Sequence, residues 1–231
     1  MKTEYTELAL FDLDGTLLEG DSELAWSDFL ARKGLIDPAE CERNAQAFEQ
    51  AYHGGMLDER TFLAFHLAPV QRLKQHPRSW FDTLSREFQQ HVVPEMIRPG
   101  ARALVARHLE AGALVALVTA TNSFITGPIA RTLGIGHVVA TVLEQDSRGA
   151  FTGNCSGRPA FREGKIERVE HWLASLGMHH HAFRRSVFYS DSINDLPMLE
   201  WVRDPVVVTP DATLADIARR RGWSTLDCRS L

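Results

Sequence analysis

Four short apolar runs, each ending at a polar residue, constrain the fold of this chain more than any other feature of its sequence. Runs of this length suit strands that are buried on both faces of a parallel sheet. They occupy residues 8–11, 114–118, 187–189 and 206–208. Segments with helical spacing lie between them, over 98–110, 123–133 and 163–176. Strands alternating with helices predict an α/β fold with a doubly wound, Rossmann-like and mostly parallel sheet.

The segment between the first run and the helix at Pro99 contains no convincing strand, and at roughly eighty residues it is too long for a loop. Apolar residues recur there at helical spacing, so we expect several amphipathic helices. The expected breaks between them are Gly34, Pro38, Gly54–Gly55, Pro69 and Pro77. We therefore predict a catalytic core of residues 1–17 and 96–231 and an inserted, all-helical cap domain of residues 18–95. A strand pair or hairpin appended to the sheet is expected over 138–151.

Composition excludes several classes of protein. The formal net charge of −5 at pH 7 provides no positive field for binding nucleic acid. Three widely spaced cysteines suggest neither a disulfide framework nor a zinc site, which favours a reducing cytoplasm. The apolar run that follows the acidic N-terminus is too short for a signal peptide or a membrane span, so no membrane partner is expected. A monomer and a homodimer both fit the sequence.

Carboxylates follow the first and third apolar runs. Asp12 and Asp14 leave the first strand two residues apart and therefore face the same way. Asp191 and Asp195 follow the third. A turn after a strand would explain the first pair and a helix N-cap the second. Because ligands collect at the carboxyl ends of strands in such sheets, however, both pairs can meet at one site. A cluster of oxygen ligands without His or Cys suits Mg²⁺, the usual partner of phosphate oxygens.

These residues suit phosphoryl transfer. Asp12 is ionised at neutral pH and could attack phosphorus without a base. Asp14 could then protonate the leaving alcohol and later activate water. Neutralising the phosphoryl oxygens calls for further donors, for which Thr119 and Lys165 are candidates. Taken alone, Thr119 reads as an ordinary strand residue and Lys165 as a solvated one.

In order and spacing, four segments resemble the motifs of the haloacid dehalogenase superfamily: Phe11-Asp12-Leu13-Asp14-Gly15-Thr16, Thr119 after its strand, Gly164-Lys165, and Tyr189-Ser190-Asp191-Ser192-Ile193-Asn194-Asp195. The resemblance spans nearly the whole chain. It implies that Asp12 is the nucleophile and Asp14 the acid and base. It also implies that Mg²⁺ is bound by Asp12, the Asp14 backbone carbonyl and Asp191, that Asp195 supports this shell, and that Thr119 and Lys165 hold the phosphoryl group.

The expected cap resembles that of the phosphoserine phosphatase branch, which includes a group similar to histidinol phosphatases. Asp21 stands where that branch has a Glu that contacts the substrate amine, and Glu23 lies close by. Asn122 is a further candidate for substrate binding. The cap arginine that binds the serine carboxylate in that branch falls near Ala64 here, and a carboxylate without such a partner binds poorly. A phosphorylated amino alcohol such as histidinol phosphate is therefore at least as good a candidate as phosphoserine.

The sequence thus predicts a magnesium-dependent phosphatase of a small phosphorylated metabolite. A dehalogenase would also use an Asp nucleophile but has no use for the second Asp or the acid pair. A receiver-like signalling module would be much shorter, and an inactive interaction protein would not need a candidate for every catalytic role. We interpret His179, His180 and His181 as a solvated loop, because they precede a strand and lie at the opposite edge of the sheet from the carboxylates.

Overall fold

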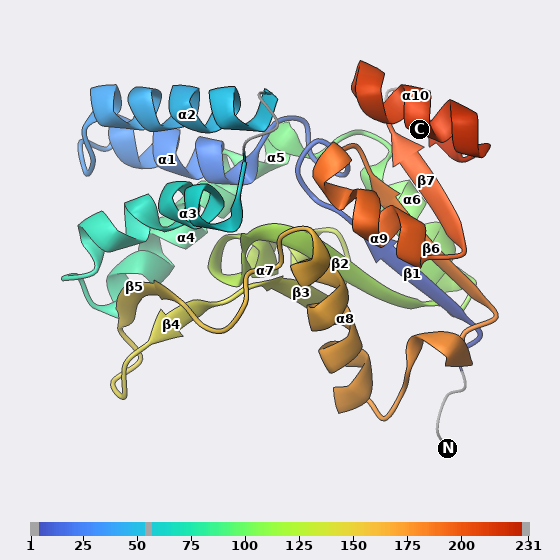
Figure 1. The fold of residues 1–231 in the computed structure, drawn as a ribbon. Helices are drawn as coiled ribbons and strands as arrows, with labels where there is room; N and C mark the ends of the chain where they lie inside the picture. Colours follow the sequence, from blue (N-terminus) through green and yellow to red (C-terminus); the bar gives the residue numbers. More distant parts are fainter. Residues whose placement is uncertain (1–4, 54–56, 228–231) are drawn as a thin grey trace.

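A six-stranded parallel sheet forms the centre of the molecule (Figure 1). The structure is a computed structural model, and it describes residues 5–53 and 57–227. The strand order is β3-β2-β1-β6-β7-β8, which confirms the predicted doubly wound α/β fold. The strands are β1 (Glu7–Phe11), β2 (Leu114–Asn122), β3 (His137–Thr141), β6 (Arg185–Ser190), β7 (Asp204–Val208) and β8 (Ser224–Leu226).

Helices cover both faces of this sheet, because the side chains of its central strands alternate between two apolar clusters. Ala9 and Phe11 of β1 belong to one cluster, and Leu8 and Leu10 belong to the other. All four side chains are fully buried. The connecting helices are α6 (Ala101–Glu110), α7 (Ser123–Thr132), α8 (Glu163–Ser175), α9 (Leu196–Trp201) and α10 (Ala212–Arg221), with short 3₁₀ turns at His180–Ala182 and Ile193–Asp195. None of the helices in the described ranges is long and apolar enough to cross a membrane.

The segment between β1 and α6 is helical, as the sequence predicts. Its helices are α1 (Ser22–Arg32), α2 (Pro38–His53), α3 (Glu59–Leu73), α4 (Arg78–His91) and α5 (Val93–Met96). Pro38 begins α2 and Pro77 precedes α4, but the break expected at Pro69 is wrong, because this residue lies inside α3. A proline costs the helix one hydrogen bond, and burial of the apolar face that Pro69 shares with Val70 and Leu73 offsets that loss. The break expected at Gly54–Gly55 lies outside the described residues.

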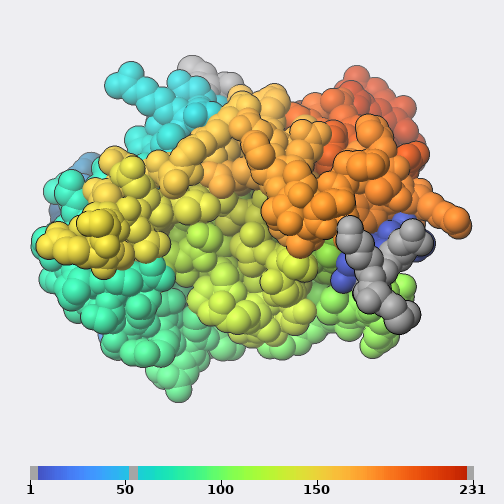
Figure 2. All heavy atoms as spheres, turned by 90° about the horizontal axis from the view of Figure 1, so that it is seen from below, coloured from blue at the N-terminus to red at the C-terminus, as the bar shows by residue number. Residues whose placement is uncertain are grey.

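The region expected to form a hairpin on the main sheet divides into two parts. Val138 belongs to β3, the edge strand of the main sheet. The hairpin itself is β4 (Leu143–Gln145) with β5 (Phe151–Cys155), a separate antiparallel pair. It packs on the helical insertion, where the Phe151 ring lies edge-on to Phe81 of α4. Figure 2 shows the yellow surface of this hairpin against the blue-green surface of the insertion.

The insertion and the sheet share one apolar cluster. Trp26 of α1 is 2% exposed, and its ring packs edge-on against Phe88 of α4 and Phe124 of α7. A backbone bridge between Leu18 and Ile97 joins the two ends of the insertion. The helices that follow β1 are therefore anchored on the same core as the strands.

The turn after β1 depends on Gly15, which has a φ of +72°. A Cβ added there would lie 2.1 Å from Asp191 Oδ2, so no larger residue fits without displacing the Asp191 carboxylate. The Gly15 carbonyl accepts a hydrogen bond from the Arg98 guanidinium at 3.1 Å, which fixes the other side of the turn. This close approach brings the ends of β1 and β6 together.

We predict that Gly15→Ala destabilises the protein more than Gly34→Ala does. Gly34 has a φ of +71° but nothing within 4 Å of an added Cβ, so this control incurs only the left-handed backbone strain of about 1–2 kcal/mol. Gly15→Ala adds the clash with Asp191 to the same strain. Urea unfolding of both variants measures the difference. Equal losses of stability in the two variants would contradict the close approach of Gly15 to the Asp191 carboxylate.

Candidate active site

A cavity of about 360 Å³ opens at the carboxyl ends of β1, β2 and β6. Asp12 directly follows β1, and Asp191 directly follows β6. Thr119 lies within β2, which continues four residues further than predicted, to Asn122. The structure thus brings the ends of these strands to one place, and all of the following predicted site residues line the cavity: Asp12, Asp14, Asp21, Thr119, Lys165, Asp191 and Asp195.

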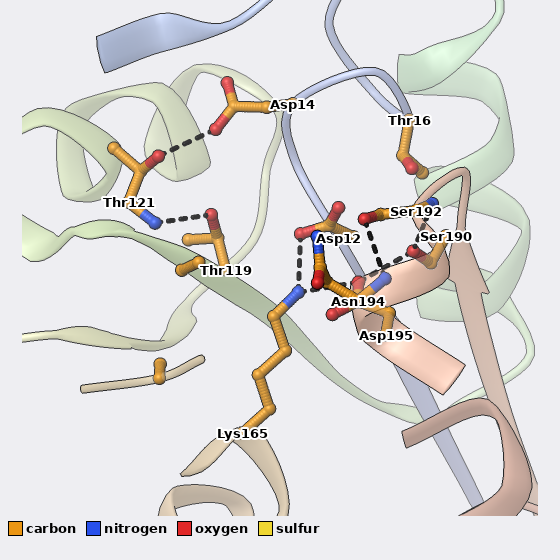
Figure 3. A network of polar contacts seen from close by, with 12 residues as sticks. Asp12, Asp14, Thr16, Thr119, Thr121, Lys165, Ser190, Ser192, Asn194 and Asp195 are labelled. Atoms are coloured by element: carbon orange, nitrogen blue, oxygen red, sulfur yellow. Dashed lines mark hydrogen bonds and ion pairs between the residues drawn. The ribbon is translucent and has the colours of Figure 1, made fainter. Parts of the chain in front are cut away.

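Lys165 links two of the carboxylates at the base of the cavity (Figure 3). Its Nζ lies 2.9 Å from Asp12 Oδ1 and 2.7 Å from Asp195 Oδ2, and the side chain is almost fully buried. Burial alone would lower the pKa of Lys165, but the carboxylates of Asp12 and Asp195 raise it above its ordinary value. The ammonium group therefore stays charged. Ser190 Oγ donates a further hydrogen bond to Asp195 Oδ2 at 2.7 Å and so fixes the far side of this pair.

The two oxygens of Asp12 have different surroundings. Oδ1 accepts a hydrogen bond from Lys165, whereas Oδ2 accepts none from any of the described residues. Oδ2 is not among the fully enclosed atoms without a partner, and Asp12 lines the cavity, so this oxygen faces the open space. Burial raises the pKa of Asp12, and the Lys165 ammonium counteracts that effect. One oxygen is thus fixed, while the other is available for attack.

Asp14 is turned away from Lys165, toward the insertion. Its Oδ1 accepts from the Ser22 backbone N–H at 2.7 Å, and its Oδ2 accepts from Thr121 Oγ1 at 2.8 Å. Burial raises the pKa of Asp14 to about 7. A carboxyl group with this pKa can both donate and accept a proton near neutral pH.

Asp191 is held beside the turn after β1. Thr16 Oγ1 donates to Asp191 Oδ1 at 2.8 Å and accepts from the Asp191 backbone N–H at 3.1 Å. Burial raises the pKa of Asp191 to about 6. This carboxylate is therefore fixed in position by the same turn that holds Asp14 and Gly15.

The donor set fits a hard cation, for which the sequence suggests Asp12, the Asp14 backbone carbonyl and Asp191 as ligands and Asp195 as support. Asp195 is bonded to Lys165 and Ser190, and the side chain of Asp14 is bonded elsewhere. Within residues 5–53 and 57–227, no group of three or more His, Cys, Asp or Glu side chains is arranged to hold a metal. What remains is the carboxylates of Asp12 and Asp191, of which the Asp191 charge raises the pKa of Asp12, and the backbone carbonyl of Asp14. Oxygen donors with excess negative charge suit Mg²⁺.

The insertion supplies the opposite wall of the cavity. Asp21 caps α1 by accepting hydrogen bonds from the backbone N–H groups of Glu23 and Leu24. The remaining wall is largely apolar and aromatic, and it consists of Leu24, Phe48, Leu57, Phe62, His66 and Phe161. Most of these side chains come from α1 to α3, and Phe161 comes from the loop that precedes α8.

Glu23 and Asn122 do not line the cavity, so the expectation that they contact a substrate directly does not fit the geometry. Both are buried, at 0% and 1% exposed. Asn122 Nδ2 donates to Glu23 Oε2 at 3.0 Å, and the same oxygen lies 3.3 Å from His66 Nδ1. Asp21 caps the first turn of α1, and Glu23 in that turn points inward to Asn122, the N-cap residue of α7.

His66 and Phe161 are two of the cavity residues that the sequence did not single out. His66 lies on the apolar face of α3, where a histidine in sequence alone reads as a core residue. The sequence signal that points to His66 is Glu23, an acid that needs a polar partner once it is buried. Phe161 gave no such signal, because its contact with Phe62 of α3 joins residues far apart in the chain.

The histidine run behaves only in part as expected. His179 and His181 are exposed, as in a solvated loop, but His180 is half-buried and its ring stacks on Trp201 at 3.7 Å. His180 Nε2 also lies 2.9 Å from Ser186 Oγ. This histidine therefore stabilises the junction of β6 and α9, far from the cavity.

Two solved structures place this architecture among known folds. A protein of unknown function from Bordetella pertussis has a TM-score of 0.88 and 43% sequence identity, with 97% of this chain and 99% of that chain covered. A substrate-bound phosphoserine phosphatase has a TM-score of 0.65 at 18% identity, with 97% and 94% covered. The second likeness supports the fold alone.

Two curated proteins and one family model are similar to this chain in sequence. A histidinol-phosphatase of Neisseria meningitidis is 42% identical over 220 residues, which are 95% of this chain and 98% of that protein. A phosphoserine phosphatase of Mycobacterium tuberculosis is 30% identical over 226 residues, 98% of this chain and 72% of that protein. The family model described as haloacid dehalogenase-like hydrolase matches residues 9–200. The chain therefore belongs to the haloacid dehalogenase-like hydrolase family.

Proposed function

We propose that this chain is a Mg²⁺-dependent phosphomonoesterase that forms an aspartyl phosphate on Asp12. Its family and its histidinol-phosphatase and phosphoserine phosphatase relatives make it a phosphatase. The observation that carries the mechanism is the asymmetry of Asp12: Oδ1 is bonded to Lys165, while Oδ2 faces the cavity. An ionised carboxylate held in this way attacks phosphorus without a separate base.

The proposed reaction has two steps. Asp12 Oδ2 forms a bond to phosphorus while the bond from phosphorus to the alcohol oxygen breaks, and Asp14 gives its proton to that oxygen. Lys165 and Thr119 lie beside Asp12 in the cavity and bind the phosphoryl oxygens. In the second step Asp14 takes a proton from water, whose oxygen attacks phosphorus and releases phosphate from Asp12. Both proton transfers use one carboxyl group, which Ser22 and Thr121 hold in position.

Mg²⁺ would be held by the carboxylates of Asp12 and Asp191 and by the Asp14 backbone carbonyl. When bound, the ion neutralises negative charge on the phosphoryl oxygens. Asp195 would act indirectly, because its carboxylate holds the Lys165 ammonium that in turn orients Asp12. Thr16 would orient Asp191 through its two hydrogen bonds.

We favour histidinol phosphate over phosphoserine as the substrate. The Neisseria meningitidis relative is named for that activity and is nearly the same length. The cavity wall has the acid Asp21, which suits an amine, and several aromatic rings, which suit a flat apolar group. None of the described residues that line the cavity is an arginine, so the carboxylate of phosphoserine lacks a bidentate partner there. This substrate would place the enzyme in amino-acid biosynthesis, in the cytoplasm.

We predict that the wild-type enzyme releases phosphate from histidinol phosphate faster than from phosphoserine, sugar phosphates or nucleotides. Asp12→Asn should lower kcat on every ester by about a thousandfold or more, because the nucleophile is lost. Asp216→Asn, on the exposed surface of α10, serves as the matched control and should retain full activity. Phosphate release measured over this panel tests both statements. Undiminished turnover by Asp12→Asn would contradict the mechanism, and a strong preference for phosphoserine would contradict the substrate.

Removal of divalent ions should abolish turnover, and added Mg²⁺ should restore it. Asp191→Asn should raise the Mg²⁺ concentration needed for half-maximal activity by about tenfold or more, because it removes a charged oxygen donor. A titration of activity with Mg²⁺ after dialysis against a chelator measures both effects. Turnover that persists in excess chelator would rule out the proposed role of the metal.

A further inference from the structure

A chain of buried hydrogen bonds ends at the cavity wall. Asn122 Nδ2 donates to Glu23 Oε2, which lies 3.3 Å from His66 Nδ1, and all three side chains are at most 4% exposed. Asn122 is itself fixed, because its Oδ1 accepts from the backbone N–H of Ile125 as the N-cap of α7. The ring of His66 is thus oriented from behind by two residues that do not reach the cavity.

The second ring nitrogen of His66 faces the open space. In the part of the chain that the structure describes, Nε2 has no hydrogen-bond partner, yet it is not among the fully enclosed polar atoms that lack one. Because His66 lines the cavity, the exposed part of its ring, including Nε2, points there. A polar atom on an otherwise apolar wall gives a ligand one directional contact.

Burial keeps the His66 ring neutral. Burial lowers the pKa of His66 to about 4 and raises the pKa of Glu23, so His66 is not held as a cation at neutral pH. One proton shared between Oε2 and Nδ1 decides whether Nε2 is a donor or an acceptor. A neutral imidazole presents both an N–H and a lone pair and can match either state, whereas an ammonium group matches only an acceptor.

Aromatic rings flank His66 in a way that suits a flat group. Phe62 of α3 stacks on Phe161 with ring centroids 4.5 Å apart and planes inclined by 10°. The His66 ring lies 4.0 Å from Phe62, and Phe48 of α2 lines the same wall. Asp21, at the N-terminus of α1, lines the same cavity, and its negative charge acts on the His66 ring and raises the pKa of His66 against the effect of burial. The wall therefore offers one place for a charged amine and another for a ring that carries nitrogen.

We propose that His66 determines specificity by forming a hydrogen bond, through Nε2, to a ring nitrogen of the leaving alcohol, with Glu23 and Asn122 as positioning residues. The ring of the alcohol packs against the aromatic wall formed by Phe48, Phe62 and Phe161. This inference rests on the proposed phosphatase function and names the group that selects its substrate.

The test compares histidinol phosphate with phenylalaninol phosphate, which has the same amino alcohol but a phenyl ring in place of imidazole. p-Nitrophenyl phosphate serves as the ester that needs no ring contact. His66→Phe should raise KM for histidinol phosphate by about tenfold or more, the effect of one lost hydrogen bond in a buried site, with a smaller change in kcat. Turnover of the other two esters should stay within about twofold of the wild type, which is much less than the tenfold rise in KM expected for histidinol phosphate. The wild-type preference for the imidazole ester then disappears.

A pair of Glu23 variants tests the positioning role and decides the matter if His66→Phe fails to fold. Glu23→Gln can still bond to both Asn122 and His66, so it should keep the preference for histidinol phosphate. Glu23→Ala releases the His66 ring and should lose that preference, while p-nitrophenyl phosphate turnover is retained. Circular dichroism of each variant verifies folding.

The outcomes separate this inference from the function on which it rests. Equal losses on all three esters in His66→Phe would make His66 a structural residue and overturn the inference. Wild-type enzyme that hydrolyses p-nitrophenyl phosphate without preferring the imidazole ester would also overturn it, yet would leave the phosphatase chemistry standing. Wild-type enzyme that releases phosphate from none of the esters would overturn the proposed function, and the inference with it.

Discussion

The ammonium group of Lys165 is the interaction on which the arrangement of the site depends. The parallel sheet places Asp12, Asp191 and Asp195 at one edge, and burial there penalises the charges of Asp12 and Asp191. Lys165 reaches this edge from α8 and bonds to both Asp12 and Asp195. Removing one partner of such a buried pair costs about 3–5 kcal/mol, because it leaves an uncompensated charge. The same contact that permits the carboxylates to be buried also leaves one oxygen of Asp12 directed into the cavity.

The second constraint is the shared core between the insertion and the sheet. Trp26, Phe88 and Phe124 join α1, α4 and α7, so the residues of the cavity wall are positioned by the same packing as the residues beside Asp12. In the proposed function, chemistry and selectivity are thereby divided between two sides of one cavity. The sheet edge carries the carboxylates, and the insertion carries Asp21, the aromatic wall and His66.

Sequence alone predicts what depends on local pattern. The apolar runs gave the parallel sheet and the edge where Asp12 and Asp191 meet, because both follow from the order of strands and helices. The break expected at Pro69 is absent because burial of α3 outweighs one lost hydrogen bond. The position of Glu23 behind Asp21 does not follow from sequence, because its distance along the chain from Asp12 does not determine which side of α1 its side chain occupies. The His66 contact and the stacking of Phe161 on Phe62 join residues distant in the chain, and only tertiary packing reveals them.

The central claim is that Asp12 itself carries the phosphoryl group during turnover. Rapid acid quenching of the enzyme during hydrolysis of histidinol phosphate, followed by peptide mass spectrometry, measures this directly. We predict a phosphoryl group on the peptide that contains Asp12, and none on that peptide in Asp12→Asn. A phosphoryl group found on another residue, or burst-free turnover with no labelled peptide at any quench time, would contradict it.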